Sequence, residues 1–225
     1  MYDGESDFDK IKAEFFALTG ENYDGLFALD LPNSVGNNQG TGNPCKHMLY
    51  SDPFNGFLDR TVKDGVEKEY EKHEKTLLNY TKTSKYSYLF ECAATLCKLM
   101  CIKYALGART RNAYQTADKK TLSNLVKDYK RCEKLLEKFY LAYRKVWYKE
   151  NKPQGFDIHD LRLGGVARRL RSCRERLQDY VLGKVKNIPE LEEKLLDFYG
   201  NGENFEKEKT PTYNTWINNA SVNVM

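Results

Sequence analysis

The residues with the most obvious capacity for chemistry are Cys45 and His47, a thiol and an imidazole two positions apart. Such a pair can act as nucleophile and base, but the imidazole needs a third group that orients it. No acid neighbours either residue in the sequence. We therefore expect no catalysis at this pair.

Other catalytic patterns are equally poor. Glu192 and Glu193 are adjacent carboxylates, but their charged surroundings are typical of a solvated helix face rather than of an acid–base pair. The glycine-rich run 36–42 lacks the lysine and hydroxyl residue of a phosphate-binding loop, and no strand pattern precedes it. Serine-hydrolase and zinc-protease motifs are absent. The sequence therefore predicts no catalytic residue.

Metal binding is not indicated either. None of the six cysteines forms a pair with two residues between them, and the three histidines, His47, His73 and His159, are scattered. Cys97 and Cys101 share one apolar helical face, but zinc would need two further ligands. We expect no metal, no cofactor and six free, mostly buried thiols, since free cysteine behaves as a small apolar residue. They are Cys45, Cys92, Cys97, Cys101, Cys132 and Cys173.

One charged cluster has two interpretations. Asp157, Asp160, Arg162, Arg168 and Arg169 surround the start of a long helical pattern. Arg162, close to the glycines at 164 and 165, is either a buried anchor that ties helices together or part of an exposed charged set. The sequence leaves both open.

Composition bounds the class of protein. In 225 residues, 40% are hydrophobic and 30% charged, which is typical of a helical protein with a substantial core. The net charge of +4 is small and dispersed, which argues against nucleic-acid binding. No apolar run approaches the ~18 residues of a membrane span, so we expect no membrane association. Residues 1–10 are acidic without an apolar core, so no signal peptide is predicted, and with free thiols this indicates a cytoplasmic location.

The apolar periodicity predicts an all-α fold. We expect a bundle of long antiparallel helices, preceded by a short N-terminal helical segment and a loop-rich lead-in. Residues 1–199 would form a single helical domain, with loop and rigid lead-in at 33–59, and 200–225 a linker and C-terminal tail. Within the tail, residues 213–217 are apolar enough to dock on the body. The expected helices are 8–18, 23–31, 61–81, 86–116, 119–150, 158–182 and 189–198.

The lead-in has a distinctive composition from Asn43 to Asp59. Pro44 and Pro53 restrict the backbone and Gly56 permits a tight turn. Asp59 is placed to cap the helix expected at 61–81. The stretch reads as a rigid lead-in rather than a catalytic motif.

Several strings resemble, in order and at matching separations, the C-terminal helical domain of bacterial glycoside hydrolase family 20 β-N-acetylhexosaminidases. The resemblance extends from about residue 15 to 196. The strings lie at residues 16–20 (FALTG), 29–33 (LDLPN), 43–59, 88–91 (YLFE), 151–153 (NKP) with 155–156 (GF), 160–165 (DLRLGG) and 188–192 (IPELE).

In that family the catalytic part is a TIM barrel with an Asp-Glu pair at a strand end. The Glu is the general acid, and the Asp orients the substrate N-acetyl group that attacks the anomeric carbon, an exception to two-carboxylate hydrolysis. This chain has no Asp-Glu dipeptide, only two tryptophans, and no alternating strand–helix pattern for a barrel. The family's catalytic residues are therefore not carried over to any position.

The resemblance implies a non-catalytic domain that packs on and stabilises the catalytic barrel of the same polypeptide. Subunit contacts in a homodimer are a second role that we consider. The alternative is a free-standing helical protein-interaction module, and an enzyme in its own right is the least favoured reading. Tyr50, Asp52 and Phe54 are the proposed barrel-docking residues, and the competing expectation is that these aromatics fold back into the helical core.

Overall fold

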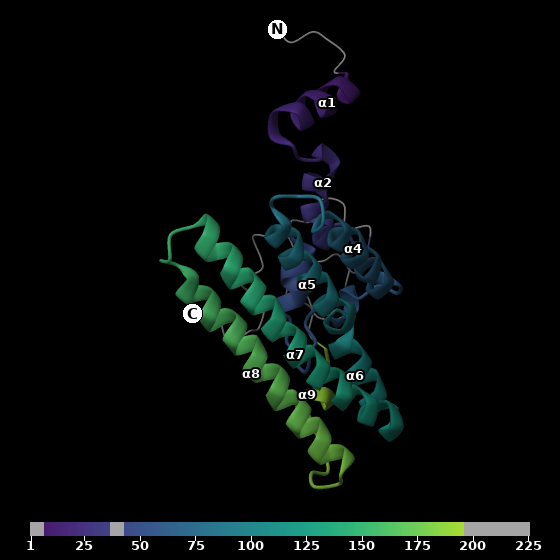
Figure 1. The fold of residues 1–225 in the computed structure, drawn as a ribbon. Helices are drawn as coiled ribbons and strands as arrows, with labels where there is room; N and C mark the ends of the chain where they lie inside the picture. The colour runs from purple at the N-terminus through teal and green to yellow at the C-terminus, as the bar shows by residue number, and fades with distance from the viewer. Residues whose placement is uncertain (1–6, 37–42, 196–225) are drawn as a thin grey trace.

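The structure, a computed structural model, describes residues 7–36 and 43–195 (Figure 1). These ranges are all-α and contain no strand, which confirms the predicted fold class. The expected tail at 200–225, including residues 213–217, lies outside the described residues. The helices are α1 Phe8–Thr19, α2 Tyr23–Phe27, α3 Pro44–Tyr50, α4 Val66–Tyr80, α5 Ser87–Lys103, α6 Leu106–Gln115, α7 Lys119–Glu150, α8 Phe156–Val181 and α9 Pro189–Glu192, with 3-10 turns η1 Ala28–Asn33 and η2 Asp59–Thr61.

The long helices pack as antiparallel neighbours. Tyr88, at the start of α5, donates its hydroxyl proton to Glu150 at the end of α7. Across α7 and α8, the Tyr140 hydroxyl donates to Asp160 at 2.8 Å. Figure 1 shows α7 and α8 side by side along one flank, with α4 and α5 on the other side and α1 standing off at one end. Short connections explain the antiparallel order.

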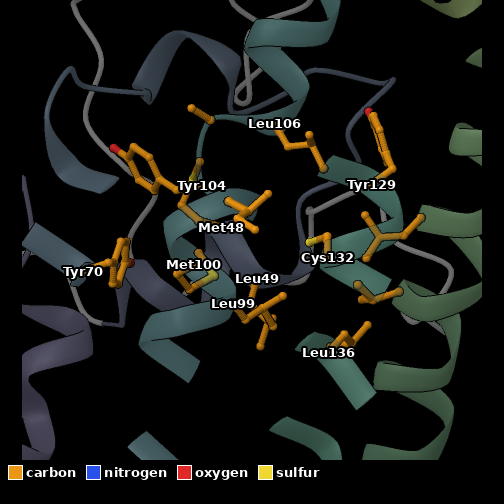
Figure 2. Close-up of a cluster of buried hydrophobic side chains, with 14 of the residues drawn as sticks. Met48, Leu49, Tyr70, Leu99, Met100, Tyr104, Leu106, Tyr129, Cys132 and Leu136 are labelled. Carbon is orange, nitrogen blue, oxygen red and sulfur yellow. The ribbon is translucent and has the colours of Figure 1, made fainter. Parts of the chain in front are cut away.

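The core forms because each long helix has an apolar stripe of helical period. On α7 the buried side chains recur every three or four positions, at Leu122, Leu125, Tyr129, Cys132, Leu136 and Phe139. They meet apolar side chains from α3, α4, α5 and α6, as Figure 2 shows. In the described part of the chain, no helix has both the length and the apolar character required to cross a membrane.

The lead-in is not a loop throughout. Residues 44–50 form α3, which begins with Pro44 at its first position, where a proline costs no hydrogen bond. Six of its seven residues are buried, and Lys46 is the exception. A helix buried nearly all round has no amphipathic period, which is why the pattern did not reveal it.

The helix expected at 86–116 is two helices, α5 and α6, which separate at Tyr104 and Ala105. Neither glycine nor proline marks the break. The Tyr104 hydroxyl instead accepts from the Lys63 amide at 3.1 Å and lies 3.4 Å from the Thr61 carbonyl. These are tertiary contacts with the segment that leads from η2 to α4, and local propensity does not report them.

Asp59 does not cap the following helix, so that prediction is wrong. It lies in η2, and α4 begins only at Val66, after Gly65 in the left-handed region with φ +84°. No side chain caps α4. The Asp59 carboxylate is occupied elsewhere, in an ion pair with Arg111.

All six cysteines are free, and only Cys101 is not fully buried. Burial raises the pKa of the Cys101 thiol to about 11 and that of the Cys92 thiol to about 12. Because the thiolate is the reactive form, buried thiols of raised pKa are slow nucleophiles. The sulfur atoms therefore serve as packing groups.

We expect unfolded, unreduced protein to titrate as six thiols. In the native protein Cys101 should react first, as the faster phase of a slow overall reaction, because it is the least buried thiol even though its pKa is raised. Stopped-flow reaction with a chromogenic disulfide reagent measures both. Cys101→Ala should remove the fast phase, and Cys132→Ala, at a fully buried position, should leave it unchanged. A fast phase that survives Cys101→Ala would contradict this assignment.

Candidate functional site

The segment that follows α3 holds the three residues predicted to dock on another domain. The Phe54 ring is fully buried and meets the Tyr129 ring edge-on, at 6.5 Å between centroids. The Arg169 guanidinium lies over the Phe54 ring, with its Cζ 5.6 Å from the ring centroid. Tyr50 is 7% exposed. Both aromatics thus pack into the body of this chain.

Asp52 organises the turn between these aromatics. Its Oδ1 accepts the backbone N–H groups of Phe54 at 2.8 Å and Asn55 at 3.0 Å, a local turn that a short acidic side chain favours. Its Oδ2 accepts from Nε of Arg169 on α8 at 2.5 Å. This two-point contact of a guanidinium with a carboxylate fixes the turn against α8.

All of the contacts given above for Tyr50, Asp52 and Phe54 are made within the described chain, which includes no second domain. Contact of Tyr50, Asp52 and Phe54 with a catalytic barrel stays a prediction. Any such contact would use the little surface that these residues leave, since their main contacts are internal.

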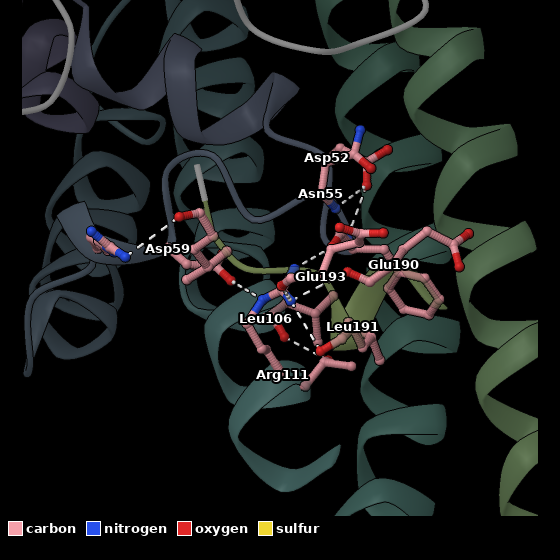
Figure 3. Close-up of polar contacts among 12 residues, drawn as sticks. Asp52, Asn55, Asp59, Leu106, Arg111, Glu190, Leu191 and Glu193 are labelled. Atoms are coloured by element: carbon pink, nitrogen blue, oxygen red, sulfur yellow. Dashed lines mark hydrogen bonds and ion pairs between the residues drawn. The ribbon is translucent and has the colours of Figure 1, made fainter. Parts of the chain in front are cut away.

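Arg111 of α6 is the centre of the polar contacts (Figure 3). Its side chain is 5% exposed and its Nε lies 3.3 Å from Asp59 Oδ2. One terminal nitrogen donates to the Phe54 carbonyl at 2.5 Å. The other donates to three carbonyls at the end of α9, those of Glu190 at 3.2 Å, Leu191 at 3.1 Å and Glu193 at 3.4 Å.

The donor geometry of Arg111 matches its surroundings. The last carbonyls of a helix lack intrahelical partners, and α9 directs three of them at one guanidinium. Arginine supplies several donors in a fixed fork, which lysine does not. A single side chain therefore joins η2, the turn after Pro53 and α9.

Two glycines make this approach possible. A Cβ on Gly56, which has φ +70°, would lie 2.8 Å from an Arg111 nitrogen and 2.8 Å from Asp59 Oδ2. A Cβ on Gly107 would lie 2.9 Å from the Pro53 carbonyl oxygen. Any larger residue at either position would push the segment away from α6.

Burial, rather than pairing, dominates the electrostatics of this site. Burial raises the pKa of Asp59 to about 6, and the Arg111 guanidinium opposes that rise. A buried ion pair gives little net stability because two charges lose their hydration, but removal of one partner leaves a buried charge uncompensated. The pair therefore fixes geometry more than it adds free energy.

Lys103 is a second buried cation, at the end of α5. Its ammonium donates to the carbonyls of Met48 at 2.8 Å and Ser51 at 2.9 Å, at the C-terminal end of α3. Burial lowers its pKa to about 8. A cation is favoured at a helix C-terminus, so Lys103 holds the end of α3 on α5.

A cavity of 510 Å³ opens between η1, α3, α5, α7 and α8. Its wall is mainly apolar and includes Tyr50 and Leu163, with Lys46, Arg162 and His159 among its polar residues. Arg162 is half-buried at the cavity wall, so it is neither the fully buried anchor nor part of a fully exposed charged set. Another residue of the same cluster, Arg169, joins α8 to the turn at Asp52.

Cys45 and His47 do not form a catalytic pair. Burial raises the pKa of the Cys45 thiol to about 12 and lowers the pKa of His47 to about 4. The thiol thus keeps its proton and the imidazole stays neutral at physiological pH. Within residues 7–36 and 43–195, no group of three or more histidine, cysteine or acidic side chains is arranged to hold a metal ion.

The sequence reading missed the residues that organise this site, Arg111, Asp59 in its true role, and Lys103. A signal existed for one of them, because Gly107 and Arg111 are four apart and therefore share a helix face. A glycine next to an arginine on one helix face, as with Gly107 and Arg111, indicates that the backbone of another segment packs closely there.

The sequence pattern of the family described as "Glycoside Hydrolase 20C C-terminal domain" matches residues 23–210. The match runs from the start of α2 past α9 and covers most of the chain. It includes every residue of the site described above. No curated protein matches the chain.

Replacement of Arg111 by methionine should lower the free energy of unfolding by about 3–5 kcal/mol, because Asp59 and four carbonyls lose their buried donor. Urea unfolding followed by circular dichroism measures the loss. Arg109→Met, on the exposed side of α6 and paired with Asp128, should cost below about 1 kcal/mol. Arg111→Met with Asp59→Leu should recover part of the loss. Equal effects of Arg111→Met and Arg109→Met would refute the central role of Arg111.

Phe54→Ala should destabilise the isolated chain by about 3–5 kcal/mol, since it empties a fully buried ring site. Tyr50→Ala should cost less, because the Tyr50 ring already borders the cavity. Asn55→Ala is the matched control, an exposed residue of the same turn with an expected effect within about 0.5 kcal/mol. If Phe54→Ala behaves like Asn55→Ala, the ring does not belong to the core in solution.

Proposed function

We propose, from the premise that this chain belongs to the glycoside hydrolase 20C C-terminal domain family, that it is the non-catalytic helical domain of a β-N-acetylhexosaminidase. The observation that carries this proposal is the family match over residues 23–210. A C-terminal domain implies a catalytic domain in the same polypeptide. The proposed role is to pack on that domain, a TIM barrel, and to stabilise it.

The parent enzyme would release terminal N-acetylhexosamine by substrate-assisted hydrolysis. In that reaction a glutamic acid protonates the leaving group and an aspartate orients the N-acetyl group. The least exposed carboxylates of the described residues already have partners within the chain, since Glu21 accepts from the Lys85 amide, Asp52 pairs with Arg169 and Asp59 pairs with Arg111. Both reacting groups would therefore come from the barrel.

The architecture supports a stabilising role. Buried Arg111, half-buried Arg169 and buried Lys103 fix the lead-in, α3 and α9 on the long helices, which gives the domain a defined shape before any contact with a partner. A preformed surface loses little entropy when it binds. Anything that binds only the folded form of the barrel raises the apparent stability of the barrel.

Two finer features remain proposals. We place the parent protein in the cytoplasm, on the support of six free thiols. We keep contact between two copies of the chain as a prediction alone, for which the described residues offer no specific support.

The isolated chain should not hydrolyse chromogenic N-acetyl-β-hexosaminides, because it contains no Asp-Glu pair to protonate the leaving group and orient the N-acetyl group. Release of the chromophore by purified protein measures this. Turnover that a substitution in this chain abolishes would disprove the non-catalytic reading.

The stabilising role is tested in the parent polypeptide, with the catalytic domain upstream of this chain. Heating followed by assay of residual hexosaminidase activity should give a higher midpoint with the helical domain present than for the catalytic domain alone. Phe54→Ala, which weakens the helical core, should lower that midpoint. Equal midpoints, or a gene that encodes no catalytic domain upstream, would favour the free-standing interaction module. If Tyr50 also contacts the barrel, Tyr50→Ala should cost more in the parent than in the isolated chain.

A further inference from the structure

The helix α1 carries an apolar stripe that the rest of the described chain leaves largely exposed. Phe8, Ile11, Phe15 and Leu18 lie at helical spacing on one face. Phe8 is 59% exposed and Leu18 is 87% exposed, and α1 contains no buried residue at all. Phe16, at 60% exposure, flanks the stripe. In Figure 1, α1 stands away from the bundle.

Despite this exposure, α1 is a well-formed helix with both ends capped. Asp7 accepts from the Lys10 amide at 3.1 Å, and Gly20, in the left-handed region, donates to the Phe16 carbonyl at 2.8 Å. Twelve residues alone form a marginal helix in water, since most helical stability comes from packing of the apolar face. Within the described residues, Phe15 packs against Tyr23 of α2, but Phe8 and Leu18 of this face remain exposed.

The orientation of α1 is fixed from its C-terminal end. Lys85, in the turn between α4 and α5, donates its ammonium to the Thr19 carbonyl and its amide to Glu21, each at 3.0 Å. The Phe15 ring meets the Tyr23 ring of α2 edge-on, at 5.5 Å between centroids. The stripe is therefore held at a set place relative to the bundle.

The charges of α1 suit a partner with an apolar surface. Lys12 pairs with Asp24 at 2.9 Å, and Lys10 lies 3.9 Å from Glu14. None of the stripe residues is charged, and the charged neighbours Lys12 and Glu14 have partners within the chain. A partner could cover the stripe without burial of an unpaired charge, which would be costly.

The position of α1 in the sequence identifies its partner. The family match begins at residue 23, so α1 lies just before the C-terminal domain, on the side where the catalytic domain of the parent would precede it. We propose that the catalytic domain covers the α1 stripe, and that α1 forms the contact between the two domains closest to the point where the chain passes from one to the other. This inference rests on the proposed function.

The matched variants are Leu18→Glu on α1 and Leu161→Glu on α8, since these side chains are 87% and 74% exposed. Neither should change the melting temperature of the isolated chain, because neither residue packs in the core. In the parent polypeptide, Leu18→Glu should lower the midpoint of thermal inactivation of hexosaminidase activity by several degrees, and Leu161→Glu should leave it within error.

No effect of Leu18→Glu in the parent, or an equal effect of Leu161→Glu, would overturn the inference. If wild-type chain still stabilises the catalytic domain in that case, the proposed function stands and only the contact surface is wrong. If wild-type chain gives no stabilisation, both fail. Sedimentation velocity of the isolated chain tests a second copy as occupant. A concentration-dependent dimer lost in Leu18→Glu but kept in Leu161→Glu would assign the stripe to self-association and refute the proposal.

Discussion

The structure depends on one buried guanidinium. Arg111 reaches η2, the turn after Pro53 and the end of α9, and without it these three segments have no shared donor. Gly56 and Gly107 permit this close packing, since a Cβ at Gly56 would collide with Arg111 and a Cβ at Gly107 would collide with Pro53. Because arginine holds five donors in one plane, it can satisfy an acid and several carbonyls at once. Arg111 thus adds tertiary contacts to the local restriction that the prolines impose on the lead-in.

The helical architecture was predictable because it follows from local periodicity. The stripe of α7 from Leu122 to Phe139 and that of α8 from Leu163 to Leu177 specify which faces meet, and short connections specify antiparallel order. The start of α7 also has a local basis, since the Asp118 side chain caps it by accepting from the Thr121 amide. The break after Lys103 has no such local basis, and the contacts beside it join Tyr104 to residues 41 to 43 positions away.

The site was much less predictable than the fold. Asp59 looked like a helix cap because a cap needs only local sequence, whereas its true partner lies 52 positions further on. For Tyr50 and Phe54 the sequence left a docking surface and the helical core as alternatives. Tyr50 is buried as the last residue of α3, and the amphipathic signal of α3 is missing because the helix is buried nearly all round. Phe54 packs instead against Tyr129 of α7, a contact between residues far apart in the sequence. Family resemblance, in contrast, was readable from ordered strings, and the match over residues 23–210 establishes it.

The contacts of Arg111 also imply an order of events in folding. The α7–α8 hairpin joins residues such as Tyr140 and Asp160, only 20 positions apart, so its loop closes at small entropic cost. Arg111 must instead gather α9 from about 80 positions ahead and the lead-in from more than 50 positions behind. Contacts between residues so far apart in the sequence form late, because the chain must lose the entropy of closing a long loop before the contact can stabilise it. The chain should therefore assemble its long helices first and bind the lead-in and α9 to Arg111 of α6 in its final step. While α9 is still inside the ribosome, the long helices can form but Arg111 lacks the carbonyls of α9 that it binds in the folded domain.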